Sequence, residues 1–347
     1  MKDARPPAHP GLRYALRMLL SAGAAAACVF LGSEMAGRFF GGYVQHVVIL
    51  MGINMLLAAS LNLINGEAGQ FSIGHAGFMT IGAYICGGMA VRWRDSLFTG
   101  APENAPAFFL LLLAGGVGAG FSGLIVGLPT LRLRGDYLAI ATLGFGEIVR
   151  VALLNLNSVG GARGLPGIPP CNTLVATYGV LVVAVAVLRN LSASRFGRAL
   201  RALREDETAA EAIGINATKY KVAAFVVGAF FAGVAGGLYA HLYTVITPNM
   251  SGFMRSVEMV LMVVLGGSGS LTGSLIGAAV LTVLPESLRD LGASLPTYGD
   301  LRMVFYSALL IALMLARREG LLGTRELSWA VLARLGQKLG LSRGRAS

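Results

Sequence analysis

Long apolar runs separated by short polar linkers dominate the pattern of this chain. A helix that crosses the ~30 Å hydrocarbon layer of a bilayer needs about 20 mostly apolar residues. The runs that approach or reach this length cover residues 14–33, 43–64, 71–91, 107–128, 136–156, 173–189, 220–242, 253–268, 271–288 and 301–316. The pattern predicts an all-α, polytopic membrane protein with about ten (eight to ten) membrane-spanning or half-spanning helices.

One pair of these runs is interrupted by a flexible linker. Residues 253–268 and 271–288 are divided by Gly266-Gly267-Ser268-Gly269-Ser270. Two short helices with a non-helical break are therefore as plausible here as two full crossings. Such a break survives at membrane depth only where it is buried in protein or lines a cavity.

The composition agrees with a membrane protein. Of 347 residues, 55% are hydrophobic and 13% are charged, and the mean hydropathy is +0.69. A soluble domain carries about 25% charged residues, so this chain has too few polar side chains to coat a water-exposed surface. Glycine pairs four residues apart, which let membrane helices approach closely, occur at Gly116/Gly120, Gly123/Gly127, Gly233/Gly237 and Gly273/Gly277.

The net charge of +11 raises the possibility of a nucleic-acid partner, but the position of the charge argues against one. Basic residues lie in short gaps between apolar runs and are not clustered on one folded face. If the N-terminus is cytoplasmic, 20 of the 28 basic residues fall on the inner side. The positive-inside rule then favours ten crossings, with cytoplasmic tails at residues 1–13 and 317–347 and a transmembrane domain over residues 14–316.

The linker 190–219 is too long for a turn and too polar for a membrane span. Apolar residues recur in it at helical spacing, which predicts an amphipathic helix lying parallel to the membrane. This stripe consists of Phe196, Leu200, Leu203 and Ala210. Arginines precede a cluster of four acids within seven residues. The acids favour docking to another protein over resting on an anionic lipid surface, the alternative for such a helix.

The same linker resembles a known family. Residues 201–216, RALREDETAAEAIGIN, followed by Lys219-Tyr220-Lys221, are similar to the cytoplasmic loop of branched-chain amino acid ABC transporter permeases of the LivM type. Three further stretches agree, GQFSIGHAGF at 69–78, RLRGDYLAIATLGFGEIVR at 132–150 and MVVLGGSGSLTG at 262–273. The resemblance covers about residues 45 to 290, in order.

The resemblance implies an ABC importer permease fold, half of a pore in a bacterial inner membrane. It implies a second permease of the LivH type, two ATP-binding subunits of the LivG and LivF types and a periplasmic substrate-binding protein as partners. The cargo would be leucine, isoleucine, valine or a related small amino acid, with urea or short amides as the alternative within the family. The linker would couple the permease to the ATPases through Arg198, Arg201, Arg204, Glu205, Asp206, Glu207, Glu211 and Gly214.

No nucleotide or catalytic motif is found in the chain. None of its four lysines stands in the Gly-x-x-x-x-Gly-Lys context that cradles phosphates. We therefore expect that the protein is not an enzyme, needs no cofactor, and receives energy from separate ATPases. An ion-coupled secondary transporter that uses Glu147 remains an alternative, and a membrane-bound enzyme is a weaker one because no catalytic group of acids, histidines or cysteines converges.

Polar residues within the apolar runs are candidates for the pathway or for gating. They are Asn54, Asn62, Gln70, Ser72, His75, Thr142 and Glu147. Glu147 and Arg150 are three residues apart, so they are expected to pair on one helix face or to face the interface with a partner, and structural pairing is favoured over a transport role. His75 is more readily explained as a packing residue than as a gate. The predicted topology separates it from His46 and His241, which argues against a metal site.

Overall fold

Helices form most of the part of the chain that the structure describes. The computed structural model describes residues 41–93, 105–130, 136–293, 307–308, 311 and 320–323. The predicted span 14–33, most of the predicted span 301–316, the tail 1–13 and most of the tail 317–347 lie outside the described residues. Where it is described, the chain confirms the predicted all-α fold.

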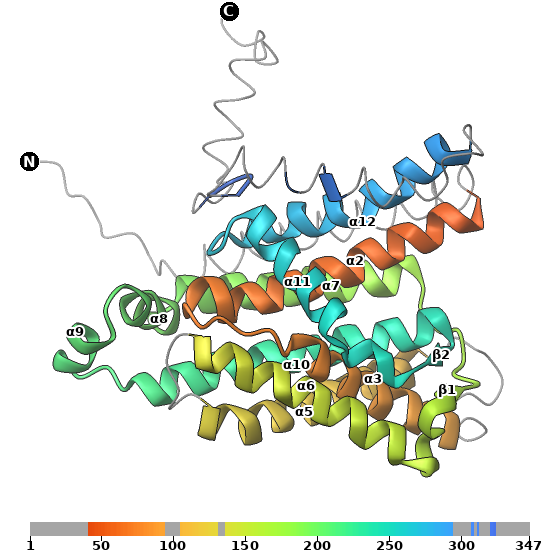
Figure 1. The fold of residues 1–347 in the computed structure, drawn as a ribbon, viewed down its shortest axis with the longest axis horizontal. Coiled ribbons are helices and arrows are strands. Elements are labelled where there is room, and N and C mark those ends of the chain that lie inside the picture. Colours follow the sequence, from red (N-terminus) through yellow and green to blue (C-terminus); the bar gives the residue numbers. More distant parts are fainter. Residues whose placement is uncertain are drawn as a thin grey trace, which may run out of the picture.

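The helices follow the apolar runs closely (Figure 1). They are α2 (Gly42–Asn62), α3 (His75–Arg92), α5 (Ala105–Thr130), α6 (Asp136–Asn155), α7 (Leu174–Ala193), α8 (Arg195–Glu205), α9 (Glu207–Ala212), α10 (Ala217–Tyr243), α11 (Phe253–Gly266) and α12 (Leu271–Ala293). A π-helical turn, η1 (Leu63–Glu67), continues α2. Three short 3₁₀ turns are η2 (Asn157–Val159), η3 (Gly161–Arg163) and η4 (Pro248–Ser251). Strands β1 (Leu165–Pro166) and β2 (Val245–Ile246) pair antiparallel.

Within the described part of the chain, five helical segments are long and apolar enough to cross a membrane. They are Gly42–Glu67, Pro106–Pro129, Tyr137–Asn155, Leu174–Ala193 and Ala217–Tyr243. The first and the last of these are mostly buried by other parts of the protein, whereas α6 and α7 are largely exposed. α2 and α10 therefore form the centre of the bundle, and α5, α6 and α7 lie around it.

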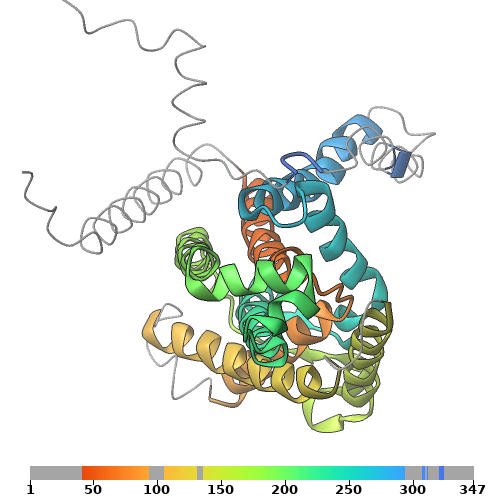
Figure 2. The ribbon, with the colours of Figure 1, turned by 90° about the vertical axis from the view of Figure 1, so that its left-hand side faces the viewer.

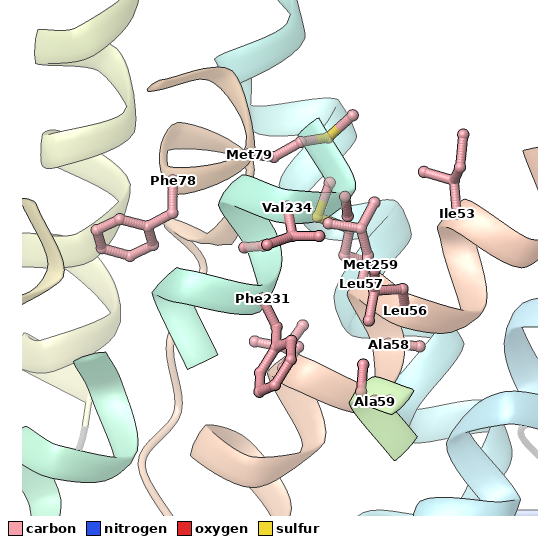
Figure 3. Packing of buried hydrophobic residues seen from close by; sticks show 14 of the residues in the cluster. Ile53, Leu56, Leu57, Ala58, Ala59, Phe78, Met79, Phe231, Val234 and Met259 are labelled. Carbon is pink, nitrogen blue, oxygen red and sulfur yellow. The ribbon is translucent and has the colours of Figure 1, made fainter. Parts of the chain in front are cut away.

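The apolar core lies where α2, α3, α10 and α11 meet. Leu57, Met79, Phe231 and Met259 from these helices gather in one cluster (Figure 3). Phe78 packs edge-on against Phe225 with 5.4 Å between the ring centroids. This cluster joins residues that lie far apart in the sequence into one packed core.

Close helix packing depends on glycine, as the sequence predicts. A Cβ atom on Gly236 of α10 would overlap the carbonyl oxygen of Met79 in α3. A Cβ on Gly277 of α12 would overlap the carbonyl oxygen of Met262 in α11. Backbones at this distance leave no room for a side chain, so these crossings require glycine.

The interrupted run forms two short helices, one of the two arrangements that the sequence left open. α11 has 14 residues, a length of about 21 Å at 1.5 Å per residue, which is less than a full crossing. The break turns through Gly267 and Gly269, whose φ angles of 113° and 95° suit glycine. Backbone N–H groups of Leu321 and Leu322 bond to the last carbonyls of α11, so the break is covered by protein.

Linkers gather at the two ends of the bundle. At one end, η1, α8 and the turn between α11 and α12 contact one another. At the other end, β1 pairs with β2, and His241 of α10 bonds to the carbonyl of Pro169. Figures 1 and 2 show α8 lying across the end of the bundle, the orientation expected for a helix parallel to a membrane surface.

Candidate functional site

The linker between α7 and α10 folds into two short helices, α8 and α9. Leu200, Leu203 and Ala210 are buried, and the Phe196 ring packs against the ring of Tyr220 with 5.6 Å between centroids. The predicted apolar stripe is therefore the face that docks on the bundle. The opposite face of the two helices is exposed.

Polar side chains set the boundaries of each helix in this linker. Ser194 Oγ accepts a hydrogen bond from the N–H of Phe196, and Asp206 Oδ1 accepts one from the N–H of Ala209. Asn216 Oδ1 accepts the N–H of Lys219 at the start of α10. These are N-cap bonds, which satisfy backbone donors that a helix start leaves free. Gly214 follows α9 with a φ of 87°, a left-handed conformation that glycine adopts at helix ends.

Two of the three candidate arginines point toward the bundle. Arg201 Nη1 donates to Glu67 Oε2 at 3.1 Å, and Arg204 Nη1 donates to the carbonyl oxygen of Gly66 at 2.9 Å. The Glu67 side chain is only 8% exposed and also accepts a hydrogen bond from Ser192 Oγ. Arg198 lies on the exposed face and donates to the carbonyl of Ala193.

The acceptors of both arginines belong to the π-helical turn. π-helical turns occur often at functional sites. Asn62, directly before this turn, accepts the N–H of Gly269 at 2.9 Å. Gly66 packs so closely on Gly269 that a Cβ there would overlap its backbone nitrogen. A movement of α8 would therefore be transmitted both to the end of α2 and to the turn between α11 and α12.

The candidate acids divide between internal contacts and the exposed face. Glu207 forms an ion pair with Lys221 at 2.8 Å, and Glu205 pairs with Arg204 at 2.8 Å while staying 73% exposed. Glu211 is exposed, as is Ile213, whose side chain at the tip of the linker is 76% exposed. Single exposed apolar residues are common on protein surfaces, so Ile213 is of interest only for its position at the tip, beside the exposed acids.

The polar candidates near the start of α3 lie together. His75 Nε2 is 2.9 Å from Ser60 Oγ, Thr142 Oγ1 accepts the N–H of Ile73, and the N–H of Ser72 donates to Asn65. Four buried side-chain atoms have no hydrogen-bond partner within the described ranges; one is the hydroxyl of Tyr84, and the other three lie here, namely Gln70 Oε1, Ser72 Oγ and His75 Nδ1. These groups line the same end of the bundle as η1.

The remaining candidates lie at other depths. Asn54, near the middle of α2, accepts a hydrogen bond from Arg255 Nη2 at 2.9 Å and donates one to Thr282 at 2.9 Å. Glu147 pairs with Arg150 at 2.7 Å, which confirms the predicted ion pair on one helix face. Over the described ranges, no group of three or more histidines, cysteines or acids could hold a metal ion.

Sequence reasoning missed Glu67 and Ile213. Glu67 closes the apolar run of α2 and could have been noticed as an acid beside a membrane span, since such residues are functional candidates. Ile213 gave no signal, because one isoleucine among alternating polar and apolar residues is compatible with a buried position.

Comparison with known proteins agrees with this architecture. A family model described as "Branched-chain amino acid transport system / permease component" matches residues 43–314. The Salmonella typhimurium high-affinity branched-chain amino acid transport system permease protein LivM is 33% identical over 305 residues, which cover 78% of this chain and 68% of the relative. The probable LivM permease of Methanocaldococcus jannaschii is 29% identical over 279 residues, 70% of this chain and 80% of the relative. Escherichia coli LivH is 42% identical over 134 residues, 38% of this chain and 41% of the relative.

Proposed function

Because this chain belongs to the family of permease components of branched-chain amino acid transport systems, we propose that it forms half of the pore of an ATP-driven importer. The cargo is leucine, isoleucine, valine or a related small amino acid. The relatives named LivM and LivH support pairing with a second permease. Two ATP-binding subunits and a periplasmic binding protein complete the assembly.

The observation that carries the proposal is how α8 and α9 are attached to the rest of the helical bundle. Their buried face is fixed to η1 and α10 by Arg201, Arg204 and Lys221. Their outer face leaves Glu211 and Ile213 available to a partner. ATP-driven movement of the membrane helices requires an element that links them to the surface on which the ATPases dock. α8 and α9 are positioned to be that element.

This role assigns an orientation to the molecule. The end that carries α8 and α9 faces the cytoplasm, where the ATPases bind, and both termini lie on that side. The end that carries β1 and β2 faces the binding protein. Glu147, the ion site of a secondary transporter in the alternative hypothesis, forms an ion pair with Arg150, and this pairing accounts for a carboxylate in the span without a transport role.

The docking face is tested best at its exposed apolar tip. Reversing the charge of Glu205 or Glu207 would also break internal ion pairs, and changing Asp206 would remove the N-cap of α9. Ile213→Asp changes only an exposed side chain. Loss of an anchor at an interface typically costs about 2 kcal/mol, or about 30-fold in affinity.

We therefore expect that the Ile213→Asp permease, purified with its second permease, loses the ATPase subunits and ATP-driven leucine uptake. The matched control is Leu156→Asp, which places the same acid at an exposed apolar position, 47% exposed, at the opposite end. It should retain the ATPases. Equal retention of ATPases by both variants would contradict the proposed docking face. Competition of leucine uptake by valine, urea and acetamide then identifies the cargo class.

A further inference from the structure

A helix begins halfway through the bundle on one side of the molecule. The carbonyl oxygen of Ser251, just before α11, lies 3.3 Å from the position of a Cβ on Gly146, near the middle of α6. Arg255 in the first turn of α11 reaches Asn54 near the middle of α2. The chain therefore returns from the outer end through η4 to mid-depth before α11 starts.

Two ion pairs lie beside this point. Glu147 and Arg150 of α6 are 39% and 34% exposed, and Glu258 and Arg255 of α11 are 52% and 23% exposed. Figure 2 shows α6 and α11 on the same side of the molecule, opposite α7. The exposed surface beside these two pairs is called here the α6–α11 face; it also includes Val151, one turn after Glu147 and 49% exposed, and Met254, next to Arg255 and 75% exposed.

The α6–α11 face is unsuited to lipid. Placing one charged side chain at the centre of a bilayer costs about 2.5–3.5 kcal/mol on the insertion scale, and such groups face protein or a water-filled cavity. By contrast, the exposed side of α7 carries Val183 at 64% exposure at a similar position along its helix. Two half-exposed ion pairs on one side therefore mark the surface that is kept from hydrocarbon.

We propose that the α6–α11 face is the wall of the aqueous pathway and that Arg255 and Glu258 contact the carboxylate and the ammonium group of a passing α-amino acid. The cargo class rests on the proposed function. In a dry interface with the second permease, these pairs would carry a desolvation penalty that their mutual attraction only partly offsets. In a pathway they remain hydrated.

The geometry of Arg255 suits brief contact with a carboxylate. Its guanidinium is held by Asn54 at 2.9 Å and by Glu258 at 2.7 Å, and it lies over the ring of Tyr239 at 5.8 Å. Arginine has five N–H donors in a planar fork, so donors remain for a ligand. A zwitterion can exchange partners with the Arg255–Glu258 pair at little net cost, which allows passage without tight binding. Met254 beside the pair offers apolar contact to an aliphatic side chain.

Water access tests the α6–α11 face without disturbing either ion pair. Val151→Cys, Met254→Cys and the control Val183→Cys are made in the complete transporter in proteoliposomes, and labelling by the water-soluble reagent methanethiosulfonate ethyltrimethylammonium is timed against the unmodified chain. Only a thiolate reacts, and apolar surroundings suppress its formation. We expect the cysteines at 151 and 254 to react about tenfold faster or more than the one at 183.

Equal labelling of all three positions would overturn the proposed pathway wall, whether the face is covered by lipid or by the second permease. This measurement does not require uptake. A failed ATP-driven uptake assay with the unmodified chain would instead refute the proposed importer function. The two failures are therefore distinguishable.

The roles of the two charges are tested separately. Arg255→Gln is expected to lower ATP-driven leucine uptake about tenfold, while ATP hydrolysis by the complex persists and Arg255→Lys restores part of the uptake. Because Arg255→Gln leaves Glu258 unpaired and could impair assembly, Arg255→Gln/Glu258→Gln removes both charges together. An assembled double variant with unchanged leucine uptake would overturn the role of the pair.

Discussion

Replacing Arg201 by Gln tests whether the α8 helix is held on the bundle by its bond to the π-helical turn. The Glu67 side chain is 8% exposed, and without Arg201 the only bond left to it from the described residues would be the one from Ser192. A hydrogen bond to a charged group contributes about 1.5–3 kcal/mol. Since the Arg201 side chain is 42% exposed, water replaces part of this. We expect a loss near the lower limit, about 1.4 kcal/mol, which is about tenfold in the opening equilibrium of α8.

Amide hydrogen exchange measures this opening directly. Amides in the last turns of α8, from Leu200 to Glu205, should exchange about tenfold faster in the Arg201→Gln permease, because local opening governs their exchange. Arg198→Gln is the matched control, since it removes the same charge from the same helix but affects only a bond to the Ala193 carbonyl. Its exchange rates should stay close to those of the unmodified chain.

A double-mutant cycle completes the test. In a Glu67→Gln background, Arg201→Gln should accelerate exchange far less, because the two side chains interact directly and their effects are not additive. If Arg201→Gln and Arg198→Gln accelerate exchange equally, or if the effect of Arg201→Gln is unchanged in the Glu67→Gln background, the reasoning about this ion pair is refuted.

Two further predictions concern capping and close packing. Ser194→Ala should weaken α8 by about 1 kcal/mol, measured by faster exchange of the Phe196 amide, whereas Ser194→Gly should cost only a few tenths; equal effects would exclude a capping role for the hydroxyl. Gly236→Ala should prevent a monodisperse permease in detergent, because the new Cβ would overlap the Met79 carbonyl, while Gly179→Ala, with open space around it, should behave as the unmodified chain in size-exclusion chromatography. A well-folded Gly236→Ala protein would show that α3 and α10 can separate at little cost.

Local patterns in the sequence predicted much of the fold. The apolar runs predicted the long described helices, and the glycines after Leu265 predicted the break between α11 and α12. The spacing of Glu147 and Arg150 predicted an ion pair on one helix. Each of these depends on residues close together along the chain. The amphipathic pattern of residues 196–210 likewise predicted which side of α8 is buried.

Contacts between distant segments could not be predicted in this way. Arg201 and Arg204 read as exposed charges, yet they bond to Glu67 and Gly66, which lie 134 and 138 residues away along the chain. Which side chains meet depends on the rotation and tilt of several helices at once. Arg255 and Glu258 of α11 meet Asn54 of α2 for the same reason.

By itself, the sequence determined that this protein is a multi-pass helical membrane protein with an amphipathic linker at one end, because hydrophobic length, glycine spacing and helical periodicity act locally. Tertiary structure alone decided which polar groups are joined. It directed the inner face of the linker to the π-helical turn, left the tip of the linker exposed, and brought two ion pairs to one side of the bundle. The physical reason is that a buried charge needs a partner of opposite charge or a hydrogen-bonding group. That partner comes from the helix that the tertiary packing places next to it.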